Sequence, residues 1–120
     1  MTKQKPEYIP LWADRDIDWD NTERYDRQRH IDQRMERGFS MYDGWAFDSY
    51  IAAVISNYCK WLRKNDPAVR VDSWNKDLKF IQKTMAAYAN GDFMYANKTK
   101  WKEYHKAMKL LTKHLPGMWT

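Results

Sequence analysis

Between Met41 and Lys64 the apolar side chains recur with the period of an α-helix, and they cover a wide arc. At about 100° per residue, ten of them fall within roughly 200° of one helical wheel. These residues are Trp45, Phe47, Ile51, Ala52, Val54, Ile55, Tyr58, Cys59, Trp61 and Leu62. An arc of this width is typical of a helix that several neighbours cover. We therefore expect this segment to be the central helix, with Ser40 and Asp43 forming a capping box at its start.

A helix over residues 21–37 is predicted before this central helix. Asp20 and Glu23 have the spacing of a capping box, and Gly38 is a typical C-terminal stop. The apolar seam of the segment is thin and consists of Tyr25, Ile31 and Met35. Such a helix is expected to be mostly solvated or to lie at an interface.

Two more helices are predicted over residues 73–90 and 97–115, with stops at Gly91 and Pro116. The first carries a seam at spacings of four and three residues, and the second carries a seam within about 80° of its wheel. The two seams are Trp74, Leu78, Ile81, Met85 and Tyr88, and Trp101, Tyr104, Met108, Leu111 and Leu115.

No segment alternates apolar and polar residues as a strand does, so the predicted fold is all-α, a compact bundle of about four helices. A chain of 120 residues with 43% hydrophobic side chains can build one core. We expect a single helical domain over residues 21–120. Residues 1–20 are predicted to form an extended N-terminal arm whose patch at residues 8–12 docks on the body, because Pro10 disfavours helix there.

Four aspartates alternate in the arm, at Asp14, Asp16, Asp18 and Asp20, as in a calcium-binding loop. An EF-hand loop that began at the first of them would need glycine at its sixth place and glutamate at its twelfth. Those places hold other residue types, so the pattern disfavours calcium.

The block that begins at Gly38 resembles the motif G-(F/Y)-S-x-x-D-x-W-x-(F/L)-D-x-x-(I/L)-A of a family of small tailed-bacteriophage proteins. The matching residues are Gly38, Phe39, Ser40, Asp43, Trp45, Phe47, Asp48, Tyr50, Ile51, Ala52, Val54 and Ile55. The likeness continues through the helix led by Trp74 and returns in the leucine-rich end that closes on Trp119. The loop between helices is short here, where similar proteins carry a His-Gly-Tyr-Pro-like turn. The resemblance implies a phage origin and a site of action in the host cytoplasm, and it assigns no activity and no functional residue.

Positive charge is concentrated toward the C-terminus. Residues 1–75 carry a balance of −1, whereas residues 76–120 carry nine lysines and a balance of +6. Five of these lysines share an arc of about 80° on the last helix, away from its apolar seam. They are Lys98, Lys102, Lys106, Lys109 and Lys113. This face either binds an anionic partner or is simply solvated.

Two aromatic residues accompany the lysines as candidate contacts. Phe80 falls off the seam of its helix, among Lys76, Lys79 and Lys83, and is expected to be exposed. Trp101 belongs to an apolar seam, but its ring could also stack on a base or another ring.

Asp48 falls inside the apolar arc of the central helix, so we expect it to be buried and paired. It is either a ligand-binding or acid/base carboxylate or a structural carboxylate, and the structural interpretation is favoured. Ser40 and Asp43 are interpreted as helix caps and Trp45 as a core side chain, so all four are expected to be structural and buried.

The sequence offers few groups of residues that could form a catalytic or metal site. His105 and His114 lie on opposite sides of one helix, and His30 is in another segment, so no metal site is expected. The single cysteine, Cys59, faces the core and forms no internal disulfide. Because the sequence also lacks a glycine-rich phosphate loop, we expect no enzyme and no cofactor. It contains no transmembrane stretch and no secretory signal, which favours a cytoplasmic location without membrane contact.

Two functional hypotheses remain. The first is a non-catalytic protein of the counter-defence type that sequesters or inhibits a host protein or an anionic nucleotide messenger. The second is a nucleic-acid-binding accessory protein that sets the lysines of its last helix against phosphates. In either case we expect a homo-oligomer, because the helix over residues 21–37 has little apolar surface with which to hold a core.

Overall fold

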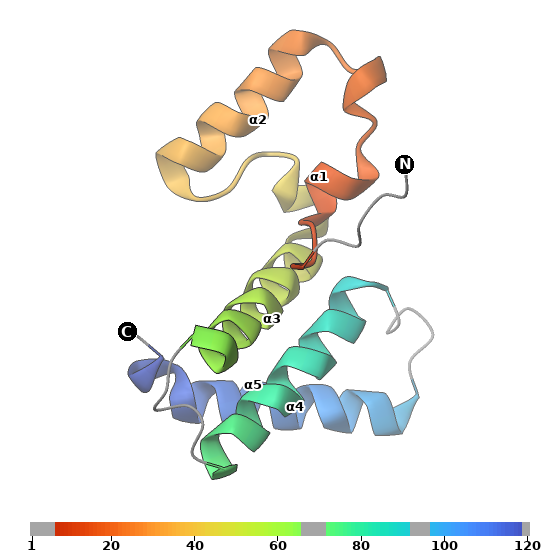
Figure 1. Cartoon of the computed structure of the whole chain (residues 1–120). Helices are drawn as coiled ribbons and strands as arrows, with labels where there is room; N and C mark the ends of the chain where they lie inside the picture. The colour runs from red at the N-terminus through yellow and green to blue at the C-terminus, as the bar shows by residue number, and fades with distance from the viewer. Residues whose placement is uncertain (1–6, 66–71, 92–96, 119–120) are drawn as a thin grey trace, which may run out of the picture.

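The computed structural model describes residues 7–65, 72–91 and 97–118. Every regular element in these ranges is helical, which confirms the all-α prediction. Four helices are long, and Figure 1 shows three of them, α3, α4 and α5, packed together while α2 stands apart. The elements are α1 (Trp12–Asp16), η1 (Trp19–Asn21), α2 (Arg24–Arg37), η2 (Asp43–Ala46), α3 (Phe47–Asn65), α4 (Asp72–Ala89), α5 (Lys98–His114) and η4 (Leu115–Gly117).

The helix ends follow local sequence signals. Helix α2 ends at Gly38, which adopts a φ of 87° and donates its N–H to Arg34 O at 2.8 Å. The left-handed backbone at this position favours glycine. Helix α5 begins after Asn97, whose side chain accepts a hydrogen bond from Lys100 N at 3.1 Å. Helix α4 ends at Ala89, and Gly91 just beyond it adopts a φ of 85°, so the stops predicted at residues 38 and 91 are both confirmed.

A reciprocal capping box precedes the central helix, as predicted. Ser40 N donates to Asp43 Oδ2 at 2.8 Å, and Asp43 N donates to Ser40 Oγ at 3.2 Å. The chain then makes a 3-10 turn, η2, so that α3 itself begins at Phe47 and ends at Asn65. The capping box thus initiates a tighter first turn than the sequence pattern alone indicated.

The core lies between α3 and α4 and between α4 and α5. Helix α4 contacts both neighbours, and its residues Leu78, Ile81 and Met85 are fully buried, as their seam predicted. The residues that α3 and α5 contribute to the same buried cluster are Ala52, Ala53, Cys59, Leu62, Ala107 and Leu111. Burial raises the pKa of the Cys59 thiol to about 12.

The apolar arc of α3 is only partly covered, contrary to expectation. Trp45 in η2 is 65% exposed, and five residues along α3 are 37–47% exposed. These five are Phe47, Ile51, Val54, Tyr58 and Trp61. The reason is that α4 covers one side of α3, whereas α2 turns away at its N-terminal end and leaves the opposite side open (Figure 1).

The N-terminal arm docks on the body, as predicted, but it is not extended throughout. Ile9 exchanges two hydrogen bonds with the Asn57 side chain of α3, at 2.8 and 2.9 Å. Helix α1 begins directly after Leu11, because Pro10 restricts the residue before it and leaves the residues after it free to be helical. The capping box predicted at Asp20 and Glu23 is wrong, since Glu23 makes no side-chain capping bond to α2.

Candidate functional site

The charged residues of α4 gather on the side of the helix that faces away from α3. At about 100° per residue, Phe80 lies roughly 200° from the buried Leu78. On the same wheel Lys76 and Lys83 lie within about 60° of Phe80, and Lys79 lies about 100° from it. Helix α5 crosses α4 (Figure 1) and brings Lys106 and Leu110 to the same place. We call the resulting cavity of about 350 Å³ the lysine pocket; it is lined by Lys76, Asp77, Lys79, Phe80, Lys83, Lys106 and Leu110.

Phe80 provides the apolar wall of the lysine pocket. Its ring is half-buried and packs against the core, so the expectation of a freely exposed ring is wrong. The reason is that α5 crosses beside it, which the α4 sequence alone does not reveal. The ammonium nitrogen of Lys106 lies 4.7 Å from the ring centroid, a cation–π distance.

The electrostatics of the pocket are strongly positive. Within the described chain, the ammonium groups of Lys76, Lys79 and Lys83 form no ion pair, and all three side chains are exposed. Asp77 is the acidic residue of the lining, and its Oδ2 lies 2.8 Å from His114 Nε2. An anion in the pocket would therefore meet lysines on several sides, while the carboxylate is held by another partner.

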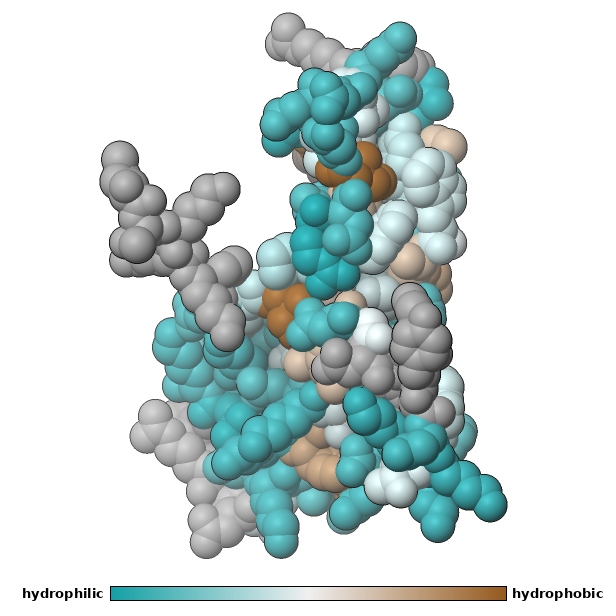
Figure 2. All heavy atoms as spheres, turned by 90° about the vertical axis from the view of Figure 1, so that its right-hand side faces the viewer, coloured by the Kyte–Doolittle hydropathy of each residue, from teal (hydrophilic) through white to brown (hydrophobic). Residues whose placement is uncertain are grey.

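The lysine row of α5 continues beyond the pocket. Lys98, Lys102, Lys106, Lys109 and Lys113 are all exposed, and Lys106 is the member that lines the cavity. Figure 2 shows that the lower part of the molecule, where α4 and α5 lie, has a largely hydrophilic surface with small hydrophobic patches. A compact anion could occupy the pocket, and a longer polyanion could follow the row.

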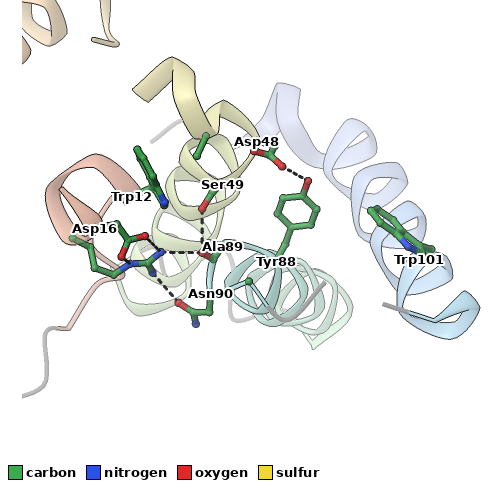
Figure 3. A pocket seen from close by; sticks show the side chains of 11 residues that line it. Trp12, Asp16, Asp48, Ser49, Tyr88, Ala89, Asn90 and Trp101 are labelled. Atoms are coloured by element: carbon green, nitrogen blue, oxygen red, sulfur yellow. Dashed lines mark hydrogen bonds and ion pairs between the residues drawn. The ribbon is translucent and has the colours of Figure 1, made fainter. Parts of the chain in front are cut away.

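Trp101 belongs to a different site. Its ring lies 5.6 Å from Tyr104 and 6.5 Å from Tyr88, edge-on to both. It lines a larger cavity of about 620 Å³ between α1, the start of α3 and the end of α4 (Figure 3), opposite Trp12. The structure therefore separates Trp101 from Phe80 and Lys106, with which the sequence analysis grouped it.

The polar groups of this second cavity bind one another. Arg15 contacts Asp16 at 3.0 Å and Asn90 at 3.3 Å, and Ser49 Oγ donates to the Ala89 carbonyl at 3.0 Å (Figure 3). These bonds satisfy the carboxyl end of α4 and hold α1 against it.

Asp48 also lines this cavity, and it is exposed rather than buried. The first turn of α3 borders an open cavity between α3 and α5, so no neighbouring helix covers the Asp48 carboxylate there. The predicted pairing is present, because Tyr88 donates its hydroxyl to Asp48 Oδ2 at 2.5 Å. This bond raises the pKa of Tyr88 to about 12. Asp48 is therefore paired with a tyrosine hydroxyl, in agreement with the structural interpretation of this carboxylate.

A buried polar cluster, which the sequence analysis did not anticipate as a whole, joins α1, α2 and η2. Asp43 is fully buried and accepts from Arg34 Nε at 2.8 Å and from Arg34 Nη2 at 2.5 Å. Arg34 Nη1 also donates to Asp14 Oδ2 at 2.6 Å. Ser40 is fully buried as well, so the expected burial holds for the two caps and fails for Asp48 and Trp45. His30 and Arg34 are one helical turn apart, which was the available signal that they share partners.

His30 lies in this cluster between a serine and an aspartate. Its Nδ1 is 2.6 Å from Ser40 Oγ, and its Nε2 is 2.9 Å from Asp14 Oδ1. This order resembles a catalytic triad, but Ser40 Oγ also accepts from Tyr42 N and Asp43 N at 3.2 Å, and it has no exposed surface. With both lone pairs occupied, the hydroxyl donates to His30. A nucleophile needs access to a substrate, so the arrangement is a structural one.

Among the described residues, no group of three or more His, Cys, Asp or Glu side chains is placed to hold a metal ion. The helices in the same part of the chain include none with the length and apolar character needed to span a bilayer. Comparisons with protein-family models, with curated proteins and with solved structures give no match to this chain.

Proposed function

We propose that this protein is a non-catalytic binding protein whose lysine pocket takes a compact anionic ligand of the nucleotide type. The observation that carries the proposal is the convergence of Lys76, Lys79, Lys83 and Lys106 around the ring of Phe80. A volume of about 350 Å³ lies within the range of small-molecule sites.

A nucleotide has an aromatic base and charged phosphates, and the pocket offers an aromatic ring and several ammonium groups. A base can stack on the Phe80 ring, and the phosphates can lie among the ammonium groups. Lys106 already covers the ring at 4.7 Å, so a base would displace its ammonium group toward the phosphates. Lysine is a flexible point charge, which suits phosphates that approach from several directions.

The biological setting that we propose rests on the resemblance to small phage proteins. Such a protein would act in the host cytoplasm by sequestering a nucleotide messenger or by blocking an acidic surface of a host protein. Stoichiometric binding of this kind needs no catalytic residue.

A second candidate function is nucleic-acid binding by α5. Its support is the exposed row of Lys98, Lys102, Lys106, Lys109 and Lys113, whose members recur at one-turn intervals of about 5–6 Å. We favour the compact ligand because residues 1–75 carry a net charge of −1 and so provide no net attraction for a long polyanion beyond the α5 row.

Calorimetric titration of the full chain with ATP, a cyclic dinucleotide and a single-stranded oligonucleotide separates these functions. If the pocket is the site, Phe80→Leu and Lys106→Gln weaken nucleotide binding about tenfold or more, as the loss of one stacked base predicts. The matched control Lys98→Gln, in the same row but outside the pocket, changes it less than about twofold.

The salt dependence supplies a second criterion. Oligonucleotide binding that is tighter than nucleotide binding, and that falls steeply with salt because several lysines of the row neutralise phosphates, would favour the second function. Absence of binding to all three probes would contradict both proposals.

A further inference from the structure

The open side of α3 carries a continuous apolar stripe. Phe47, Ile51, Val54, Tyr58 and Trp61 recur at spacings of four and three residues, so they lie above one another on one helix face. This face is about half a turn around the helix from the buried Ser56. Each of the five residues keeps 37–47% of its surface exposed.

Segments that lie near the two ends of α3 lengthen the stripe. At the N-terminal end, the ring of Phe39 lies 6.2 Å from that of Phe47, and Phe39 and Met41 are 40% and 42% exposed. At the C-terminal end, the Tyr58 hydroxyl donates to the Met118 carbonyl, which holds η4 close by. Leu115 at the start of η4 is 59% exposed.

The stripe has the spacing of a surface that can pair with itself. Val54 is its central member, and Phe47 and Trp61 lie seven residues to either side. A two-fold axis through Val54 would therefore set Phe47 of one chain opposite Trp61 of the other, at both ends of the interface. Isologous contacts of this kind are the commonest basis of dimers.

A cavity beside the stripe could receive Trp61, the largest side chain of the stripe, from a second copy of the chain. Phe47 and Ile51 form one wall of an apolar cavity of about 240 Å³ whose other wall includes Tyr104 and Met108 of α5. The same two-fold axis would bring Trp61 of a second copy to the mouth of this cavity. Trp61 is 39% exposed, so part of its indole is available to enter it.

We propose that the stripe of α3 is the interface of a homodimer in which two α3 helices pack antiparallel about an axis near Val54. A parallel pair would bring the basic ends, with Lys60, Arg63 and Lys64, together, whereas the antiparallel pair separates them and opposes the helix dipoles.

The exposed area agrees with a modest dimer. Aromatic side chains present about 150–250 Å² each and aliphatic ones somewhat less, so these eight apolar residues, which are 37–59% exposed, offer roughly 600 Å² per protomer. This is somewhat below the ~800 Å² per partner of a standard interface, and it is the size typical of weak or transient associations. The lysine pocket lies on the far side of α4, so the dimer is independent of the proposed ligand.

The solution mass of the full chain, measured by light scattering from about 1 to 100 µM, tests the proposal. We expect a concentration-dependent dimer for the wild type and a monomer for Val54→Lys, which sets two like charges against each other on the axis. Val54 is an exposed helix residue, so thermal unfolding of the variant should match that of the wild type.

Cysteine cross-linking locates the axis. Oxidation should link Val54→Cys protomers through a disulfide, because residues on the axis face their own copies. The matched control Ile31→Cys, 42% exposed on α2, should not cross-link, and the native Cys59 is fully buried. A monomer at the highest concentration, a dimer that Val54→Lys leaves intact, or a dimer in which Val54→Cys does not cross-link would each overturn the proposal.

Discussion

The ion pair between Arg34 and Asp43 is the strongest candidate for a side-chain interaction on which the fold depends. Asp43 is fully buried and receives two hydrogen bonds from the guanidinium and one from Ser40 N. Burial raises the pKa of the Asp43 carboxyl, but the bonds from Arg34 and Ser40 lower it more, so the pKa lies below its ordinary value. The Asp43→Asn variant keeps the shape of the side chain and removes the charge.

The expected cost follows from what the substitution leaves behind. Breaking one side of a buried ion pair costs about 3–5 kcal/mol. The Arg34 side chain is 21% exposed and retains Asp14 as a partner, which places the cost near the lower end, at about 3 kcal/mol. For a domain of this length, that corresponds to a fall in melting temperature of roughly 10–15 °C.

Thermal and urea unfolding followed by circular dichroism measure this effect. The matched control is Asp32→Asn on α2, the helix of Arg34. Its exposed carboxylate accepts a hydrogen bond from Gln28, and the cost should stay within about 0.5 kcal/mol. Because this cluster holds α2 to the rest of the molecule, hydrogen exchange of α2 amides should also accelerate in Asp43→Asn. Equal stability of Asp43→Asn and Asp32→Asn would refute the reasoning.

Two further predictions concern single groups. The pKa of Asp43 is lowered on folding, so its charge contributes to the free energy of unfolding above about pH 4, and this contribution is lost as the pH falls through the lowered pKa. In Asp43→Asn this part of the acid-induced loss of stability should be absent. The Cys59 thiol is buried and has a pKa of about 12. A thiol reagent at pH 8 should therefore modify it only as fast as the protein unfolds. Rapid stoichiometric modification of the native protein would contradict the placement of Cys59 in the core.

Local signals in the sequence determined the end of α2 and the turn that precedes α3, but not the start of α2. Gly38 stops α2 because it can adopt a positive φ, and Ser40 and Asp43 cap the next turn because their side chains reach each other's N–H groups. The seam of Leu78, Ile81 and Met85 likewise predicted the buried face of α4. These features depend on residues within a few positions of one another, so a single sequence is sufficient to find them.

Only the tertiary structure decided which apolar and charged faces are covered. Periodicity gives the phase of a helix but not the number of its neighbours, so the arc of α3 predicted burial for Trp45 and Asp48, both of which are exposed. The crossing of α5 over α4 set Lys106 beside Phe80, and the position of α2 set Arg34 against Asp43. Contacts of this kind join residues from different helices, and their geometry depends on how whole helices pack, which no local pattern specifies.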